Sequence, residues 1–226
     1  GAITGVGIWF SIQLASPEAT SLLIHQFVFA WATEWVAFLA ELTVLYLYYY
    51  GWGTHPERRQ LFLAGAYCVI AWISLVIING ILTFMLTPGG WTLDNRDIAA
   101  GFFNPGYFPA LFLRTGVMFL LAGVSAFVVA AGMKHDDRLR PRIVQFAAYW
   151  VIPAAVLVPA CSYAYYAQLP TAAVQLAQDG VVGLSGGKLE VMSRTVWLAG
   201  TTGSLLLVGT VTFLLRPRAL TLGAAL

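Results

Sequence analysis

The amino-acid sequence predicts an all-α protein, a polytopic transmembrane helix bundle, and three observations support this fold class. Of the 226 residues, 59% are hydrophobic, 14% are aromatic and only 10% are charged. The mean hydropathy is +0.78. Long apolar segments recur along the chain, separated by Gly, Pro and charged residues. A soluble domain carries roughly a quarter charged residues, so this composition excludes a water-exposed globular domain.

Each long apolar segment is predicted to be a membrane span, because a transmembrane helix needs about 20 mostly apolar residues. Hydropathy gives about six spans, which are 1–14, 21–50, 60–86, 107–133, 143–169 and 191–215. The first is short and starts within apolar sequence without an initiator Met, so we expect an N-terminal portion, such as a further helix, to precede it. Since the sequence shows no repeat or linker, residues 1–226 are predicted to form a single domain.

Basic residues predict the orientation of the bundle, because Lys and Arg in short loops are retained on the cytoplasmic side. Loops 51–59 and 134–142 and the C-terminal RPR carry eight of the twelve Lys and Arg residues. We expect these segments to be cytoplasmic, in a multi-pass protein of the cell inner membrane. Loops 15–20, 87–106 and 170–190 then lie on the opposite side. The net charge of +2 gives no reason to expect a nucleic-acid partner.

Glu34 and Glu41 are the strongest candidates for function, because they lie inside an apolar run that is long enough to span a bilayer. An acidic side chain near the middle of a membrane helix costs about 2.5 to 3.5 kcal/mol on insertion scales, and such residues usually serve a function. A spacing of seven residues is nearly two helical turns, so both carboxyl groups are predicted on one face, about 10 Å apart along the axis. Such a pair can transfer protons, pair with an Arg, hold a cation, bind the polar edge of a cofactor or serve packing only.

Three further residues, His25, Asn79 and Arg114, are candidates for contacts with a haem or a quinone. His25 is the only histidine in a predicted span and a candidate haem-iron ligand; the alternative is a hydrogen-bonded interfacial residue. Arg114 either extends toward the interface or neutralises a carboxylate, a haem propionate or a quinone. For Arg194, nearer the edge of a span, extension toward the interface is favoured. Asn79 is expected to hydrogen-bond across helices or to cap local backbone.

The histidine and cysteine content limits the cofactors that the chain can hold by itself. A four-helix b-type cytochrome places pairs of His on facing helices, and this chain cannot supply two such pairs. Cys68 and Cys161 lie in predicted spans and belong to no CxxC or CxxCH motif. No disulfide framework, zinc site or covalently bound c-type haem is therefore indicated.

The order of several motifs resembles part of subunit I of the cytochrome bd quinol oxidases. The resemblance covers about the first 170 residues, and the matching motifs are Gly1 to Gly5 (GAITG), Glu34 and Glu41 before Gly51 and Trp52, Asn79 and Gly80 before Pro88, and Asn104 with Pro105. It implies that these helices correspond to the second to seventh helices of the family. It also implies that the two glutamates contribute to a proton route and to the haem environment, with haem b and a quinone bound by this chain or its partners.

The sequence departs from the family at several places. Glu34 and Glu41 are one residue closer together than the paired glutamates of the family. Arg114 stands in or next to the place where the family has an axial histidine of haem b, and a guanidinium has no lone pair to offer to iron. The segment 168–188 is too short to be equivalent to the family's quinol-oxidising loop. The haem ligands of the family's N-terminal and C-terminal helices are absent from this sequence.

The sequence therefore predicts an integral-membrane subunit of a respiratory electron-transfer complex, with Glu34 and Glu41 in a proton-path or scaffold role beside haem-bearing partner subunits. Two alternatives stay open. One is a haem b subunit that uses His25 together with a partner's ligand and oxidises quinol. The other is a haem-free anchor for a peripheral redox module. A small cation or proton transporter would also use paired acids, but the sequence lacks the broken helices and inverted repeats that are common in transporters.

Overall fold

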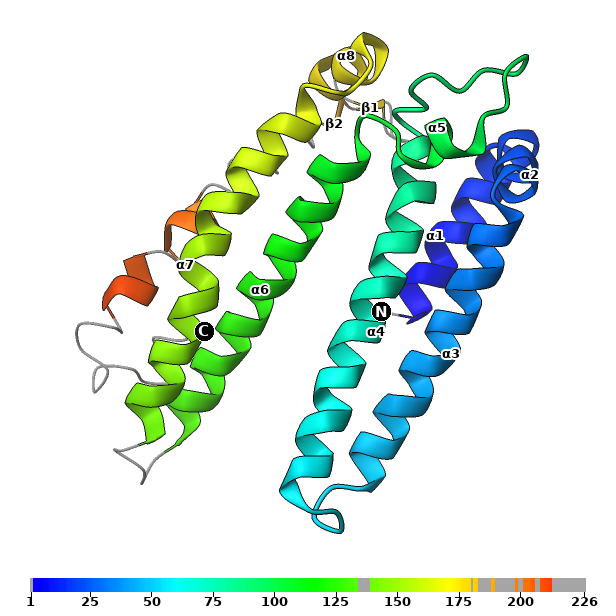
Figure 1. Cartoon of the computed structure of the whole chain (residues 1–226). Coiled ribbons are helices and arrows are strands. Elements are labelled where there is room, and N and C mark those ends of the chain that lie inside the picture. The colour runs from blue at the N-terminus through cyan, green and yellow to red at the C-terminus, as the bar shows by residue number, and fades with distance from the viewer. Residues whose placement is uncertain are drawn as a thin grey trace. The chain divides into compact units, whose positions relative to one another are not determined.

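The computed structural model describes residues 2–133, 139–179, 181–182, 188–189, 198, 201–205 and 208–212, which are almost entirely helical (Figure 1). Contacts divide the chain into two compact units, Gly1–Tyr107 and Phe108–Leu226. Within the described ranges, four helical segments are long and apolar enough to cross a membrane. The helical fold and its suitability for a lipid bilayer are thus confirmed, while a single domain over 1–226 stays a prediction.

The first unit is built around an antiparallel pair of long helices. Its elements in chain order are α1 (Ala2–Ala15), α2 (Pro17–Gln26), α3 (Val28–Tyr50), α4 (Glu57–Phe84) and the short α5 (Ile98–Phe102). The turn between α3 and α4 contains Gly53, whose φ of 77° favours glycine because a Cβ would be strained there. Asp97 begins α5, since its Oδ1 accepts hydrogen bonds from the backbone N–H groups of Ala99 and Ala100.

The second unit contains two further long helices and a small antiparallel strand pair. Its elements are α6 (Tyr107–Gly132), α7 (Leu139–Tyr166), α8 (Thr171–Asp179), β1 (Val181–Val182) and β2 (Lys188–Leu189), and residues 201–205 and 208–212 are also helical. Glycines bring α6 close to α7: a Cβ at Gly123 would overlap the Cγ2 of Val151, and one at Gly116 would lie 2.8 Å from the Cγ2 of Val158. Small residues at such positions are typical of helix pairs in membranes.

The predicted span 21–50 is not one continuous helix. Phe27, with φ of −115° and ψ of 32°, separates α2 from α3. Its side chain is only 1% exposed and packs edge-on against Phe84, with ring centroids 4.9 Å apart. Hydropathy did not reveal this break, because Phe27 is itself apolar and is followed by the apolar run of α3.

The predicted loop 15–20 is also wrong, since only Ser16 separates α1 from α2. Pro17 is the first residue of α2, a position that tolerates proline because its missing N–H would have no helical partner there. The other two loops that the sequence predicts on the non-cytoplasmic side are partly helical. Segment 87–106 contains α5, and segment 170–190 contains α8.

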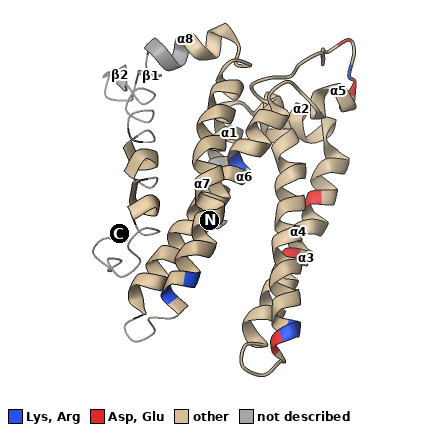
Figure 2. Ribbon diagram, turned by 60° about the vertical axis from the view of Figure 1, so that its left-hand side comes forward, with Lys and Arg blue, Asp and Glu red and all other residues tan. Residues whose placement is uncertain are grey.

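The remaining predicted spans differ in how well the described helices match them. Spans 60–86, 107–133 and 143–169 agree with α4, α6 and α7 to within four residues. Segment 1–14 is helical as α1, but this helix has only 14 residues and is too short to be one of the four candidate membrane spans. Span 191–215 lies largely outside the described residues, and so does Arg194. Figure 2 shows that charged residues are sparse along the long helices.

Candidate functional site

The face of α3 that packs against α4 carries both glutamates of this candidate span. Half-buried side chains recur along α3 every three or four residues, and Glu34 and Glu41 belong to this set. Apolar neighbours such as Trp35, Val36 and Leu42 are exposed and suit contact with lipid. The prediction that the two carboxyl groups share one helical face is therefore confirmed.

Glu34 accepts a hydrogen bond from the neighbouring helix. The hydroxyl of Ser74 in α4 donates to Oε1 of Glu34 at 3.3 Å. Ser74 is buried and Glu34 is half-buried. A serine at this depth gives the carboxyl group a polar neighbour where the alternative would be lipid or an apolar side chain, which lowers the cost of placing the acid there.

Glu41 has a similar partner two helical turns further along. The side chain of Tyr67 in α4 lies close enough to Glu41 for their polar groups to interact, and both residues are half-buried. Because α3 and α4 are antiparallel, the two pairs form successive levels between the same helices. Each level consists of a carboxyl group from α3 and a hydroxyl group from α4.

The sequence contains a signal for these partners that hydropathy alone misses. Glu34 and Ser74 lie at equal distances in sequence on either side of Thr54, and so do Glu41 and Tyr67. Thr54 lies in the turn that joins the two helices. In an antiparallel helical hairpin, residues equidistant from the turn lie at similar heights, because the rise per residue is the same in both helices. A search for polar residues at matching distances would have found both hydroxyl groups.

Asn79 lies in a buried polar network at the end of α4. Its side chain is 0% exposed, and its Nδ2 donates to the backbone carbonyl of Tyr107 at 2.9 Å. Tyr107 is the last residue of the first unit, so this bond lies within that unit. The Oδ1 of Asn79 has no hydrogen-bond partner among the described residues, so one buried acceptor remains available.

Asn104, which is also buried, connects the same end of α4 to the α5 segment. Its Nδ2 donates to the hydroxyl of Thr83 and to the carbonyl of Gly101, both at 3.0 Å. Its Oδ1 accepts from the hydroxyl of Thr87 at 3.0 Å. These bonds use the amide as donor and acceptor at once, which fixes its orientation and ties the connection to the helix.

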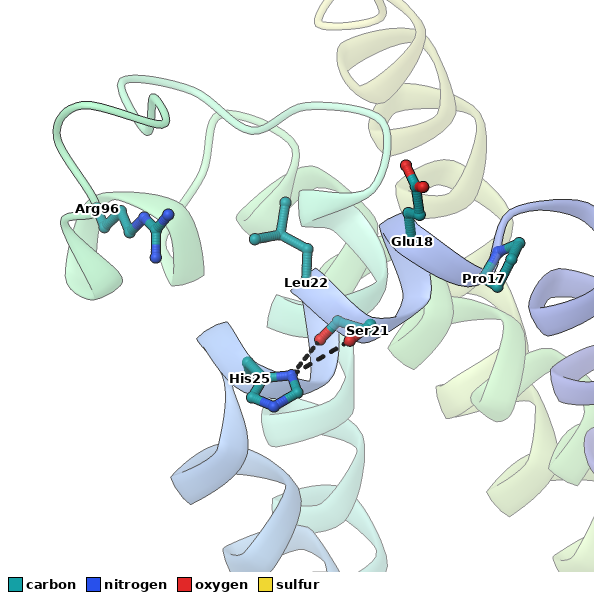
Figure 3. Close-up of a pocket in the computed structure, with 6 residues that line it drawn as sticks. All are labelled: Pro17, Glu18, Ser21, Leu22, His25 and Arg96. Atoms are coloured by element: carbon teal, nitrogen blue, oxygen red, sulfur yellow. Dashed lines mark hydrogen bonds between the residues drawn. The ribbon is translucent and has the colours of Figure 1, made fainter.

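His25 lies in a surface pocket of about 620 Å³ (Figure 3), and neither glutamate of α3 lines this pocket. The residues that line this pocket are Pro17, Glu18, Ser21, Leu22, His25 and Arg96. Nδ1 of His25 lies 2.7 Å from the carbonyl oxygen of Ser21. Since a carbonyl only accepts, Nδ1 carries the proton, and Nε2 of the neutral ring keeps a lone pair. His25 belongs to α2, outside the candidate span Val28–Tyr50, and not to a continuous span as predicted.

The surroundings of His25 are a poor match to a haem. A haem needs an axial donor and apolar walls on both sides of its ring. The pocket supplies one imidazole, but Glu18 and Arg96 line it as well. Elsewhere in the described ranges, no group of three or more His, Cys, Asp or Glu side chains is arranged to hold a metal ion.

Arg114 is half-buried on α6 in the second unit. Tyr165 in α7 is the titratable side chain that lies near it. A phenol oxygen can accept a hydrogen bond from a guanidinium, so Tyr165 offers polar surroundings within the helix pair. The predicted partners of Arg114, a carboxylate, a propionate or a quinone, remain predictions.

These features define a helical protein with four candidate membrane spans and a polar face inside one helix pair. The chain matches no model of a known protein family, and comparisons with curated proteins and with solved structures also find no match.

Proposed function

We propose that this chain is a membrane subunit of a respiratory electron-transfer complex, in which Glu34 and Glu41 transfer protons between α3 and α4. The proposal includes the resemblance to subunit I of the cytochrome bd quinol oxidases, the six-span topology and a place in the cell inner membrane. It also includes haem-bearing partner subunits and a quinol-linked oxidoreductase reaction carried out by the complex.

The observation that supports proton transfer is the pairing of each carboxyl group with a hydroxyl group. Ser74 donates a hydrogen bond to Glu34, and the hydroxyl group of Tyr67 lies close enough to interact with Glu41. Carboxyl and hydroxyl groups both donate and accept protons when the acid is neutral. An alternation of such groups along two packed helices provides the donors and acceptors that a proton route needs.

The distance between Glu34 and Glu41 along α3 determines how a proton could pass from one carboxyl group to the other. Seven residues along α3 correspond to about 10 Å, which is longer than a hydrogen bond. A proton passing between Glu34 and Glu41 therefore needs a side-chain rotation or an intervening water molecule. Ser74 and Tyr67 would hold each carboxyl group in position before and after the transfer.

The test compares proton-coupled turnover of the intact complex carrying Glu34→Gln or Glu41→Gln with that of the wild type. Glutamine keeps the size and the hydrogen-bonding ability of the side chain but cannot take up or release the proton. We expect each variant to lose at least several-fold in turnover, since a positioned proton donor or acceptor contributes about 10²-fold or more. Glu57→Gln is the matched control, because Glu57 is exposed in the first turn of α4. Turnover equal to that of the wild type in both test variants would contradict the proposal.

The same experiment separates the two alternatives. A haem-free anchor predicts that Glu34→Gln and Glu41→Gln leave turnover unchanged while the complex still assembles. A quinol-oxidising haem b subunit predicts haem absorbance in the purified chain that is lost in His25→Ala. The absence of that absorbance from the intact complex would exclude His25 as an iron ligand.

A further inference from the structure

We propose that the pocket containing His25 and an adjoining apolar cavity together bind one phospholipid that has a primary ammonium headgroup. Arg96 binds the phosphate, and Glu18 accepts hydrogen bonds from the ammonium group. This binding site is independent of the proton path between α3 and α4, because it uses none of the residues of that path.

The position of α2 relative to the candidate span Val28–Tyr50 places this pocket near the membrane interface. A helix of 23 residues is about 34 Å long, and the hydrocarbon layer of a bilayer is about 30 Å thick. The span therefore accounts for the full hydrocarbon layer. Residues of α2, which directly precede it, reach the depth at which phospholipid headgroups lie.

The charges in the pocket match a zwitterion. Figure 3 shows Glu18 and Arg96 on opposite sides of Leu22, with Arg96 coming from the connection between α4 and α5. A guanidinium presents several N–H donors in a planar arrangement that suits phosphate oxygens. A carboxylate on the opposite side suits a cation.

Glu18 favours an ammonium group that carries N–H donors over a quaternary one. The oxygens of a carboxylate are hydrogen-bond acceptors, and Glu18 lines the pocket. A primary ammonium has three N–H donors for such groups, whereas a trimethylammonium has none.

The neighbouring cavity explains why the ligand is a lipid and not a free phosphate compound. This cavity of about 370 Å³ shares Leu22 with the charged pocket, and apolar side chains such as Leu23 and Phe84 line it. Trp91 also lines it, and its buried indole N–H has no acceptor in the described part of the chain. An acyl ester supplies both an apolar segment and a carbonyl acceptor for that N–H.

Native mass spectrometry of the full chain in detergent, titrated with phosphatidylethanolamine and with phosphatidylglycerol, tests the site. The two lipids share the phosphate and the acyl esters, but only the first carries an ammonium group. We expect the wild type to bind phosphatidylethanolamine with about tenfold higher affinity than phosphatidylglycerol, which corresponds to the free energy of one charge-assisted hydrogen bond. Arg96→Gln should lower the affinity for both lipids by about tenfold, because it removes a charge-assisted hydrogen bond to the phosphate. Glu18→Gln should abolish the preference, because the remaining charge then favours the anionic lipid.

Arg58→Gln and Glu57→Gln are the charge-matched controls, since both residues are exposed at the opposite end of α4. Both controls should bind lipid as the wild type does. Trp91→Phe should lower the affinity for both lipids equally and leave the preference for phosphatidylethanolamine unchanged. Equal affinity of the wild type and Arg96→Gln would overturn the proposal, and so would a preference retained in Glu18→Gln. Displacement of the lipid by inorganic phosphate alone would also overturn it, by showing a phosphate site without a lipid site.

Discussion

The close packing of α6 against α7 predicts that Gly123→Ala destabilises the second unit. A Cβ at residue 123 would overlap the Cγ2 of Val151 and lie 3.6 Å from the carbonyl oxygen of Ala147. Val151 is 0% exposed, so its side chain has little free space into which to turn. Relief of the overlap therefore requires the two helices to move apart or Val151 to adopt a strained rotamer.

Two opposing effects determine the size of the change. Overpacking in a filled interior costs about 1 to 3 kcal/mol, and replacing a helical glycine by alanine returns up to about 1 kcal/mol through helix propensity. Gly65→Ala isolates the second effect, because nothing lies within 4 Å of a Cβ at that position in α4. The difference between the two variants in free energy of unfolding should equal the overpacking cost, about 1 to 3 kcal/mol.

The measurement is unfolding of the purified chain in detergent, followed by circular dichroism for both variants and the wild type. A double variant, Gly123→Ala with Val151→Ala, removes the atom that would be overlapped. It should be more stable than the sum of the two single changes predicts, with a coupling energy of about 1 kcal/mol or more. If Gly123→Ala were as stable as Gly65→Ala, the close approach of α6 and α7 at this glycine would be refuted.

Three other predictions concern the first unit. Tyr67→Phe and Ser74→Ala should each reduce proton-coupled turnover of the intact complex, but less than the glutamine variants do, because the carboxyl groups remain; an unchanged rate in both would remove the hydroxyl groups from the route. Asn104→Ala should destabilise the chain by about 2 to 4 kcal/mol, since three hydrogen bonds are lost and buried partners are left unpaired; thermal unfolding measures this, and a change below about 1 kcal/mol would contradict it. Asp97→Ala should cost about 1 kcal/mol by removing the N-cap of α5, whereas Asp94→Ala, in the same exposed loop, should unfold as the wild type does.

The hydropathy of the sequence was sufficient to locate the long helices, and the helical repeat was sufficient to place Glu34 and Glu41 on one face. Both properties are local, and a helix repeats every 3.6 residues whatever surrounds it. The break at Phe27 could not be found in this way, because it depends on burial of that ring against Phe84, a residue of another helix. The placement of His25 in a separate helix follows from the same break, which puts this candidate ligand outside the candidate span Val28–Tyr50.

The hydroxyl partners of the two glutamates link folding to function in this protein. An acid on an isolated membrane helix faces lipid, but in the hairpin of α3 and α4 each carboxyl group has a hydroxyl group at its own height. The cost of placing Glu34 and Glu41 in the membrane is therefore reduced only when α4 packs against α3. Ser74 and Tyr67 favour this pairing by satisfying the acids, and they are also the groups that would hold the carboxyls in position for proton transfer. Assembly of the hairpin thus places the carboxyl groups of α3 beside the hydroxyl groups of α4.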